Sequence, residues 1–417
     1  LVSGRAWGRV AASVMSHPAR SGGKARLTEG PVGRSILGRV IGLAVPLGPE
    51  VALDVDDLSV VGVDKVRRRQ LRGGDRRFLD VIADWTRASY TELRQVLFHR
   101  RATGRVRECH GDLHLGNVAL IGGEPVVFDG IEFNPQLRWI DVISEVAFLF
   151  MDLQDRGYTG LAWRFLNGYL ERTGDYAGIG LLNYFLVYRA LVRAKVAILR
   201  LAQPGLDMAA QAAVREEYRS YMDLAGQYTA QQRPALIITH GLSGSGKSWH
   251  AARLVEQLGA IRLRSDIERK RLAGFDPLER TESGLGGGIY SPEMGKRTYG
   301  RLLELSRLVI DAGFVAAADA TFLKQQQRGP FEALARELGV PFLLLDLQTP
   351  VEVLRQRITD RLRRSDDPAE ATLEVLEAQL ASAEPLTADE EPHALVVTPE
   401  LADSPALADM IRDRLVS

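Results

Sequence analysis

Residues 235–417 alternate between short apolar runs and longer stretches in which apolar residues recur at helical spacing. The runs have the length of buried strands, and most of the stretches between them have the period of amphipathic helices. The expected strands are ALIITH (235–240), AIRLRS (260–265), FVAAAD (314–319), PFLLLDL (341–347) and HALVVT (393–398). The expected helices are KSWHAARLVEQLG (247–259), residues 290–312, VEVLRQRITDRLRR (351–364) and the C-terminus. Strands that alternate with helices predict an α/β fold, a parallel sheet with right-handed crossovers and helices on both faces.

A different pattern precedes this alternation. Residues 76–101, RRFLDVIADWTRASYTELRQVLFHRR, have helical spacing, and residues 140–225 are expected to be helical throughout. Between them, short apolar runs predict strands at Val106–Cys109, Val118–Ile121 and Pro125–Phe128, the last two joined by a Gly-Gly turn. This part predicts a mostly helical domain with a few short strands.

The length of 417 residues exceeds what one core usually supports, so we expect at least two domains. The boundary is expected in the linker GQYTAQQRP (226–234), which is polar and ends in proline, between domains at 76–225 and 235–417. Residues 1–75 are rich in Gly and Arg, have little periodicity and form a poorly defined segment. The chain begins at Leu1 rather than Met, which suggests a fragment or a missed start.

Composition narrows the function classes. Lys and Arg balance Asp and Glu at 53 each, so net charge does not favour nucleic acid or a membrane surface as partner. No apolar run approaches the roughly 20 residues that span a bilayer, and we find no secretory signal. A single cysteine, Cys109, excludes an internal disulfide and leaves too few thiols for a zinc ribbon or finger. We therefore expect a cytoplasmic protein with Cys109 buried and inert.

The loop after the strand at 235–240 reads GLSGSGKS and satisfies the pattern G-x-x-x-x-G-K-S/T between a strand and a helix. Its glycines let backbone N–H groups face a polyphosphate at the positive end of the helix. Lys247 is expected to neutralise the β- and γ-phosphates, and Ser248 to hold Mg²⁺. The residues expected to contact the nucleotide are Gly241, Leu242, Ser243, Gly244, Ser245, Gly246, Lys247, Ser248 and Trp249.

Two carboxylates follow later strands. Asp266 comes at the carboxyl end of the strand at 260–265, where ligands bind in open α/β sheets, and is expected to orient or deprotonate an acceptor hydroxyl. Alternatively, Asp266 or Ser265 caps the next helix. Asp319 ends the strand FVAAAD at the Walker-B position and is expected to meet Mg²⁺ or its water.

An arginine-rich helix, RQRITDRLRR, precedes an acidic turn that contains proline. A lid of this kind would stabilise the transferring charge and exclude water, and Arg361 is its expected contact. The alternative is a solvated helix face, which is the usual role of a charge run. The arginines concerned are Arg357, Arg361, Arg363 and Arg364.

Residues 235–417 resemble the small P-loop kinases that phosphorylate hydroxyls, the group around gluconate kinase, polynucleotide kinase and zeta toxin. The features that match are GLSGSGKS, the RSD at 264–266, the DAT at 319–321 and the R-x-x-x-R of the lid. GGGIYSPEMGKRTY and DATFLKQQQR are similar to motifs of a further branch of predicted kinases. The guanine-reading N-K-x-D of GTPases is not found. The resemblance implies an AAA-family ATP-binding domain with a P-loop NTPase-type sheet, which uses ATP and Mg²⁺.

The loop HGDLHLGN (110–117) carries a second candidate site. Asp112 and Asn117 have the spacing of the catalytic base and the metal-binding asparagine in protein-kinase loops. Asp129 follows the next hairpin at a strand end, where those enzymes place a metal-binding aspartate. Phosphoryl transfer needs this set, a carboxylate to align the hydroxyl and two oxygen ligands to hold Mg²⁺.

The set resembles the aminoglycoside phosphotransferase family over about residues 76–225, the C-terminal lobe of a kinase-like α+β fold. The resemblance implies that Asp112 is the base and that Asn117 and Asp129 hold the metal. Zinc is not favoured at the histidines, because a third ligand is lacking. Structural roles are expected for His110, His114 and Asp141, and ion pairs with acidic residues, for example those of IDVISE, for Arg189, Arg193 and Lys195.

Such a lobe needs an N-terminal partner with a Gly-rich turn and an ATP-anchoring lysine. Residues 1–75 show neither pattern, and Lys24 and Lys65 lack the strand context of that lysine. Either the N-terminal lobe has been lost from this chain, or the domain no longer binds ATP well.

The order of the two domains resembles bacterial fusions of an aminoglycoside phosphotransferase-like domain with an ATP-binding kinase domain. It implies an enzyme that transfers the γ-phosphoryl group of ATP to a hydroxyl of a small polar metabolite. One alternative is a switch protein that hydrolyses ATP to move the upstream domain, and another is an upstream domain that only binds or regulates. The sequence leaves the acceptor and the oligomeric state open, since a fold-level analogy does not choose a substrate.

Overall fold

A computed structural model of the protein describes residues 73–230, 233–277, 279, 288–364, 372–402, 404 and 406–416. The chain forms two compact units, Leu1–Ala162 with Leu181–Ala230 and Trp163–Gly180 with Gln231–Ser417. The expectations for the N-terminal segment, including Lys24 and Lys65, lie outside the described residues. So do the side chains of Arg361, Arg363 and Arg364 and the start of GGGIYSPEMGKRTY.

The second unit is built on a five-stranded parallel sheet with strand order β6-β7-β5-β8-β9. Its strands are β5 (Leu236–His240), β6 (Ile261–Arg264), β7 (Ala316–Asp319), β8 (Phe342–Leu347) and β9 (Ala394–Val397). They coincide with the five apolar runs of the sequence. The central strand β5 is buried over its first four residues because helices cover both faces of the sheet.

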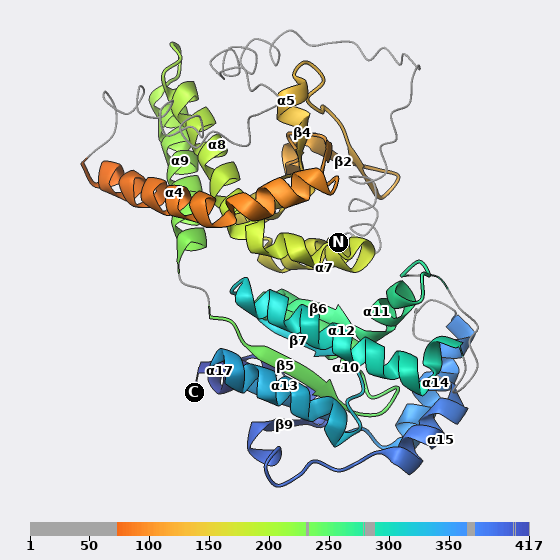
Figure 1. Ribbon diagram of the computed structural model, residues 1–417. Helices are drawn as coiled ribbons and strands as arrows, with labels where there is room; N and C mark the ends of the chain where they lie inside the picture. Colours follow the sequence, from red (N-terminus) through yellow and green to blue (C-terminus); the bar gives the residue numbers. More distant parts are fainter. Residues whose placement is uncertain are drawn as a thin grey trace. The chain divides into compact units, whose positions relative to one another are not determined.

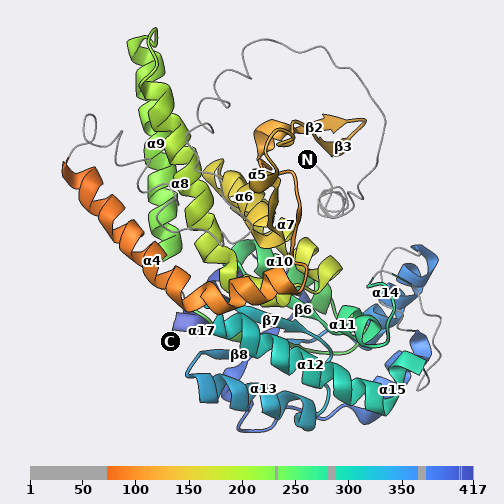
Figure 2. The ribbon, with the colours of Figure 1, turned by 45° about the horizontal axis from the view of Figure 1, so that its top comes forward.

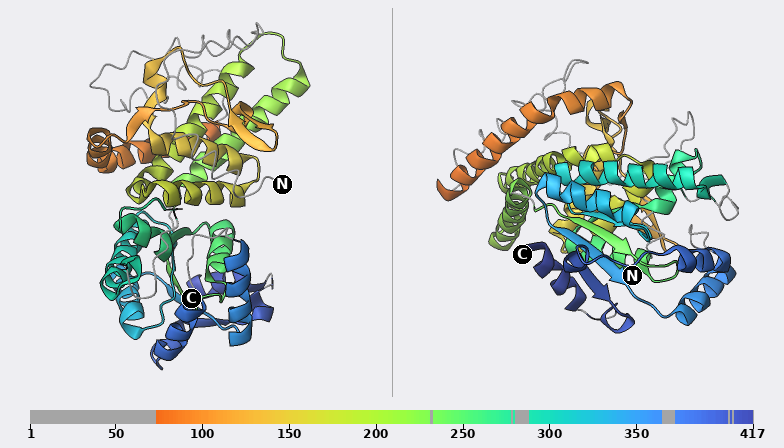
Figure 3. Two further views of the ribbon diagram at one scale, coloured as in Figure 1. Left: turned by 90° about the vertical axis from the view of Figure 1, so that its right-hand side faces the viewer. Right: turned by 60° about the horizontal axis from the view of Figure 1, so that its bottom comes forward.

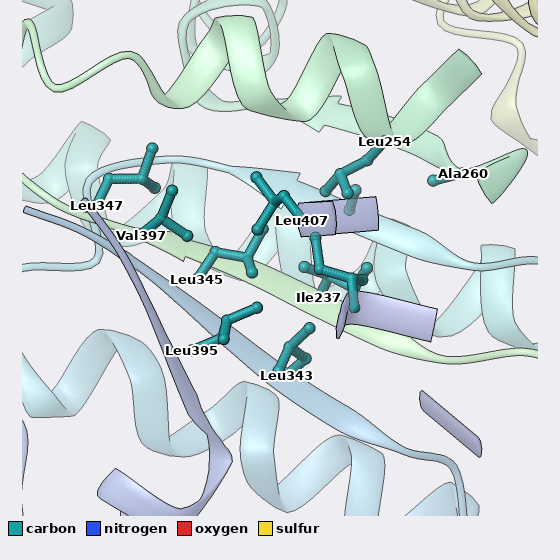
Figure 4. Packing of buried hydrophobic residues seen from close by; sticks show 11 residues of the cluster. Ile237, Leu254, Ala260, Leu343, Leu345, Leu347, Leu395, Val397 and Leu407 are labelled. Atoms are coloured by element: carbon teal, nitrogen blue, oxygen red, sulfur yellow. The ribbon is translucent and has the colours of Figure 1, made fainter. Parts of the chain in front are cut away.

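The helices of the second unit divide between the two faces of the sheet. Helices α10 and α17 pack on one face, and α12 and α13 pack on the other (Figure 1 and Figure 3). The bounds are α10 (Lys247–Leu258), α11 (Ser265–Leu272), η3 (Gly288–Tyr290), α12 (Pro292–Asp311), α13 (Gln325–Leu338), α14 (Val351–Arg364), α15 (Leu373–Ser382), η4 (Glu391–His393), α16 (Pro399–Ala402) and α17 (Ala406–Val416). Figure 4 shows one core cluster, in which Leu254 of α10 and Leu407 of α17 lie over Ile237, Leu345 and other apolar side chains of the sheet.

Strand β6 is an edge strand, and a side chain from earlier in the sequence pairs with its backbone. Asn167 accepts a hydrogen bond at Oδ1 from the backbone N–H of Arg262 (2.7 Å) and donates one from Nδ2 to the carbonyl of Ala260 (3.0 Å). An unpaired sheet edge leaves backbone donors and acceptors unsatisfied, so this amide completes part of the edge. The segment Trp163–Gly180 is for this reason a structural part of the second unit.

The first unit is mostly helical. Helices α8 and α9 lie side by side, α4 and α6 pack against α8, and β2 and β3 form a hairpin that projects from the helices (Figure 1 and Figure 2). The bounds are α4 (Gly73–Ala102), β1 (Val106–Glu108), η1 (Leu115–Asn117), β2 (Val118–Ile121), β3 (Glu124–Val127), α5 (Pro135–Arg138), β4 (Trp139–Asp141), α6 (Val142–Asp155), α7 (Thr159–Thr173), η2 (Tyr176–Leu181), α8 (Leu182–Leu201) and α9 (Met208–Thr229). From Trp163 onward, α7 belongs to the second unit.

Two elements differ from the sequence prediction. Strand β4 lies at the start of the region expected to be wholly helical, and it pairs antiparallel with β1. A strand of three residues is too short to show a period of two, so its partner, and not its pattern, defines it. Helix α9 continues to Thr229, so the start of the expected linker is helical. None of the described helices combines the length and the apolar character needed to cross a bilayer.

Candidate active site

The loop between β5 and α10 turns sharply at its glycines. Gly241 has φ +143° and Gly246 has φ +95°, in the region that favours glycine. A Cβ on Gly241 would lie 2.8 Å from Oγ of Ser245 and 2.9 Å from the carbonyl oxygen of Leu347. The glycine therefore permits a close backbone approach that another residue would block, and Lys247 starts α10 directly after the turn.

Polar contacts hold the loop in this shape. Nζ of Lys247 donates to the carbonyl of Leu242 at 2.6 Å, and the N–H of Ser243 donates to Oε1 of Gln379 at 2.8 Å. Nη1 of Arg357 donates to the carbonyl of Gly244 at 3.2 Å. A basic side chain of the arginine-rich helix α14, that of Arg357, thus reaches the loop. The contact expected for Arg361 stays a prediction, because its side chain lies outside the described residues.

An apolar contact joins α14 and α15 to the loop. Leu354, Ile358 and Leu376 form a buried cluster, against which Leu242 and Leu380 pack. This cluster places Arg357 and Gln379 beside the phosphate-binding loop. Sequence reasoning missed Gln379, because a single glutamine on an amphipathic helix carries no motif.

Asp319 ends β7 at the carboxyl edge of the sheet and is 5% exposed. Within the described residues, its Oδ2 has no hydrogen-bond partner. Burial raises the pKa of Asp319, and the positive charges of Arg262, Arg264 and Lys247 offset part of that rise. A buried carboxylate oxygen without a partner is costly unless a cation completes it, so the site fits Mg²⁺.

Asp266 lies in the first turn of α11 and is half-buried. Its Oδ1 is 3.4 Å from Nη1 of Arg269, and its negative charge contributes to the raised pKa of Asp319. The N-cap of α11 is Arg264, without a side-chain cap bond, so the capping role considered for Asp266 and Ser265 is not observed. The two carboxylates, Asp266 and Asp319, therefore lie near each other at the carboxyl end of β6 and β7.

Ser248 and Trp249 occupy the first turn of α10. The carbonyl of Ser248 accepts a hydrogen bond from Nη1 of Arg262 at 3.1 Å. Trp249 is 49% exposed, with Arg253 over its ring at 4.7 Å and the ring of His250 at the same distance. Trp249 thus contacts its own helix, and its expected contact with a nucleotide stays a prediction.

In the first unit, Asp112 and Asn117 are close together. Nδ2 of Asn117 donates to the carbonyl of Asp112 at 2.9 Å and to its Oδ2 at 3.3 Å, and Nε2 of His114 is 3.5 Å from the same Oδ2. Burial raises the pKa of Asp112, but the hydrogen bond and charge of His114 and the charges of Arg193 and Arg189 bring it below its usual value. Asp112 is therefore ionised at neutral pH.

Asp129 is held at the same loop only indirectly. The neighbouring Phe128 donates its N–H to the carbonyl of Asn117 at 3.0 Å, and its carbonyl accepts from Nε2 of His110 at 2.8 Å. Asp129 is exposed and has φ +61°, a conformation that is uncommon for aspartate. Strained backbone of this kind occurs at functional sites. Among the described contacts, none joins the carboxylates of Asp112 and Asp129.

The other residues predicted in this unit have structural contacts. Asp141 accepts two hydrogen bonds from Arg100, at 2.7 and 2.9 Å. Its Oδ1 also accepts a hydrogen bond from the N–H of Ile143, so Asp141 is the N-cap of α6. Arg189 donates to the carbonyls of Ser144 and Gly111, and Arg193 pairs with Glu217 of α9 at 3.4 Å and not with the IDVISE segment. No group of three His, Cys, Asp or Glu residues that could hold a metal ion is found in the described part of the chain.

Comparisons with known proteins agree on the C-terminal part. Residues 236–386 match the model of a family described as an AAA domain. Uncharacterized proteins of Mycobacterium bovis and Mycobacterium tuberculosis are 33% identical over 289 residues, which cover 69% of this chain and 56% of each relative. The chain spans about half the length of the curated relatives it matches.

Solved structures that are similar include two kinases. A gluconokinase from Sinorhizobium meliloti is 19% identical with a TM-score of 0.30, over 44% of this chain and 91% of that chain. The Mycobacterium tuberculosis APS kinase CysC, in complex with AMPPNP and APS, is 21% identical with a TM-score of 0.32, over 45% and 99%. Kti12 from Chaetomium thermophilum, in complex with ADP-AlF3, is 19% identical with a TM-score of 0.34, over 44% and 100%. The family match alone shows an AAA domain over residues 236–386. The aminoglycoside phosphotransferase resemblance of residues 76–225 stays a prediction.

Proposed function

We propose that the second unit is an ATP-dependent phosphotransferase, which transfers the γ-phosphoryl group to a hydroxyl of a small polar metabolite. One observation carries the proposal. The phosphate-binding loop follows β5, Asp319 ends β7 and Asp266 follows β6, and these three parallel strands are neighbours, so the loop, the candidate base and the candidate metal ligand lie at one edge of the sheet. Ligands of open α/β sheets bind at this edge.

Each residue then has a definite role. The loop N–H groups and Lys247 would bind the polyphosphate, and Ser248 and Asp319 would hold Mg²⁺, which when bound neutralises charge on the phosphate oxygens. Asp266 would orient the acceptor hydroxyl and take its proton. As the acceptor oxygen bonds to phosphorus, the bond from phosphorus to the leaving oxygen of ADP breaks.

The remaining predicted residues keep proposed roles. Arg357, at the carbonyl of Gly244, supplies positive charge beside the loop, and we extend this lid role to Arg361. Asp112, Asn117 and Asp129 would form a second phosphotransfer site or a regulatory binding site in the first unit.

The test uses two substitutions in the full chain. Lys247→Ala should lower transfer from ATP by about 100-fold or more, because one electrostatic contact to the transferring group is lost. Transfer is followed by ³¹P resonance with ATP and a mixed pool of metabolites, and Arg336→Ala on the exposed side of α13 serves as control. Full activity of Lys247→Ala would show that the loop is not the working site.

Asp266→Asn separates the kinase from an ATP-driven switch. A kinase should lose phosphoryl transfer, by about 100-fold or more, because the acceptor hydroxyl no longer has a base. A switch that only hydrolyses ATP should keep most of its hydrolysis in the Asp266→Asn variant. The proposal would be contradicted if this variant released phosphate at the wild-type rate and neither it nor wild type transferred phosphate to a metabolite.

A further inference from the structure

Glu171 of α7 lies between two arginines of the edge strand. Its Oε1 accepts from Nε and Nη2 of Arg262, at 2.9 and 2.5 Å, and its Oε2 is 3.8 Å from Nη1 of Arg264. All three side chains are largely buried, with exposed fractions of 16% or less. Glu171 is in the part of α7 that belongs to the second unit.

The same two arginines are neighbours of Asp319. Arg264 is the register partner of Asp319 across the parallel β6–β7 pair, and Arg262 pairs with Ala317. Because side chains alternate between the faces of a strand, Arg262, Arg264 and Asp319 share one face of the sheet. A guanidinium on the neighbouring strand is therefore the natural partner for the buried carboxylate of Asp319.

That pairing is not what the structure has. Oδ2 of Asp319 is without a hydrogen-bond partner within the described residues, while Arg262 donates two hydrogen bonds to Glu171. An arginine engaged with a carboxylate by two hydrogen bonds is not available to a second one at the same atoms. Arg262 is therefore bonded to Glu171 and not to Asp319.

We propose that Glu171 is a positioning residue of the nucleotide site, which holds Arg262 off Asp319 and so leaves an oxygen of Asp319 free for Mg²⁺. The inference rests on the proposed function of the second unit. Without Glu171, Arg262 would pair with Asp319 and compete with the metal ion for the same oxygen.

Further contacts show that the position of Glu171 is fixed. Its main-chain carbonyl accepts from Nη2 of Arg271 at 2.6 Å, and Asn167, one turn earlier, is bonded to the β6 edge. Through Arg262, Glu171 also reaches the carbonyl of Ser248, the other candidate ligand of Mg²⁺. A residue upstream of the phosphate-binding loop thus contacts, through Arg262, the backbone of the first turn of α10.

The test compares nucleotide binding with and without metal, in the full chain. The dissociation constant of AMP-PNP is measured by calorimetry in Mg²⁺ and in EDTA for wild type and Glu171→Gln. We expect Glu171→Gln to weaken binding about 10-fold in Mg²⁺, the usual effect of removing a partner that orients a metal ligand, and to leave binding in EDTA unchanged. Adding Arg262→Gln to Glu171→Gln should restore binding in Mg²⁺, because the competing guanidinium is gone.

A matched control comes from the same segment. Glu256→Gln breaks the ion pair between Arg164 and Glu256, which also joins α7 to α10 but has no contact with Ser248 or Asp319. This variant should bind AMP-PNP as wild type does under both conditions.

Four results would overturn the inference. If Glu171→Gln bound AMP-PNP in Mg²⁺ as tightly as wild type does, metal binding at Asp319 would not depend on Glu171. Equal weakening in Mg²⁺ and in EDTA would show that Glu171 only supports the fold. If Glu171→Gln does not fold, Arg262→Gln alone decides. Loss of Mg²⁺-dependent binding by that variant would show that Arg262 assists the metal ion and does not compete with it. Absence of AMP-PNP binding by wild type would overturn the proposed function itself.

Discussion

At the scale of a residue, Cys109 gives the sharpest chemical prediction, because it is the single thiol of the chain. Burial, and next the negative charge of Glu145, raise the pKa of Cys109 to about 12 from 9.0. The thiolate is the nucleophile, so at pH 8 iodoacetamide should alkylate the native protein about 1000-fold more slowly than the unfolded chain. Mass spectrometry of quenched samples measures the two rates.

The pH dependence of this reaction follows from the sign of the shift. In the unfolded chain the rate should level off above pH 9, whereas in the native protein it should keep rising toward pH 12. The thiol also links pH to stability. Its raised pKa contributes stability below pH 9 that is lost as the pH rises to 12, since only the unfolded chain ionises in that window. If the alkylation rate of the native protein levelled off at pH 9, the thiol would be accessible to solvent. The Cys109→Ser variant is the control that shows whether any other group reacts.

At the scale of elements, one buried ion pair holds α13 to the segment before β9. Arg328 of α13 is 1% exposed and meets Glu390 through two hydrogen bonds, at 2.7 and 2.9 Å. It also donates to the carbonyls of Phe322 and Pro385. The guanidinium thereby holds the loop after β7 to the chain after α15. The candidate metal ligand, Asp319, is the last residue of β7, directly before this loop.

Removing one partner of this pair should be costly. Glu390→Ala leaves a buried guanidinium without its carboxylate, and we expect the free energy of unfolding to fall by about 3–5 kcal/mol. Arg336→Gln, which breaks an exposed ion pair with Glu332 on the same helix, should change it by less than about 0.5 kcal/mol. Urea unfolding followed by circular dichroism measures both, and equal effects of the two substitutions would show that Arg328 is not dependent on Glu390.

The elements of the second unit could be predicted because local pattern and fold agree there. Most strands of the sheet are apolar runs, and the glycines of GLSGSGKS mark a turn that favours glycine. The contacts that tune the site could not be predicted in this way. Glu171 and Arg262 are 91 residues apart, and neither belongs to a motif. Their pairing depends on α7 reaching the β6 edge, which no periodicity encodes.

The same limit appears in the first unit. The Asp112–Asn117 pair was predicted from spacing, because the loop that joins them is short and its geometry is local. Strand β4 and the bond from His110 to the carbonyl of Phe128 were not predicted, since both depend on partners distant in the sequence. Interpretation of the Asp129 site therefore needed the structure, which places its side chain at the surface.

At the scale of the whole molecule, the question is whether one unit or both perform the transfer. The second unit contains the phosphate-binding loop, the candidate base and the candidate metal ligands within one sheet edge, so it needs no residue of the first unit for the chemistry. In the first unit, Asp112 has a lowered pKa, which makes it a weak base at neutral pH, and it has no observed contact with Asp129. We therefore propose that the second unit performs the transfer.

Asp112→Asn tests this placement in the full chain. We expect this variant to keep at least about half of the wild-type transfer in the ³¹P measurement, whereas Lys247→Ala should lose about 100-fold or more. Nε2 of His114 is 3.5 Å from Oδ2 of Asp112, so circular dichroism should first confirm that Asp112→Asn is folded. A loss of transfer in folded Asp112→Asn, with Lys247→Ala active, would assign the reaction to the first unit. If Asp112→Asn and Lys247→Ala each lost a different phosphorylated product, the two units would phosphorylate separate hydroxyls, because each site would account for its own acceptor.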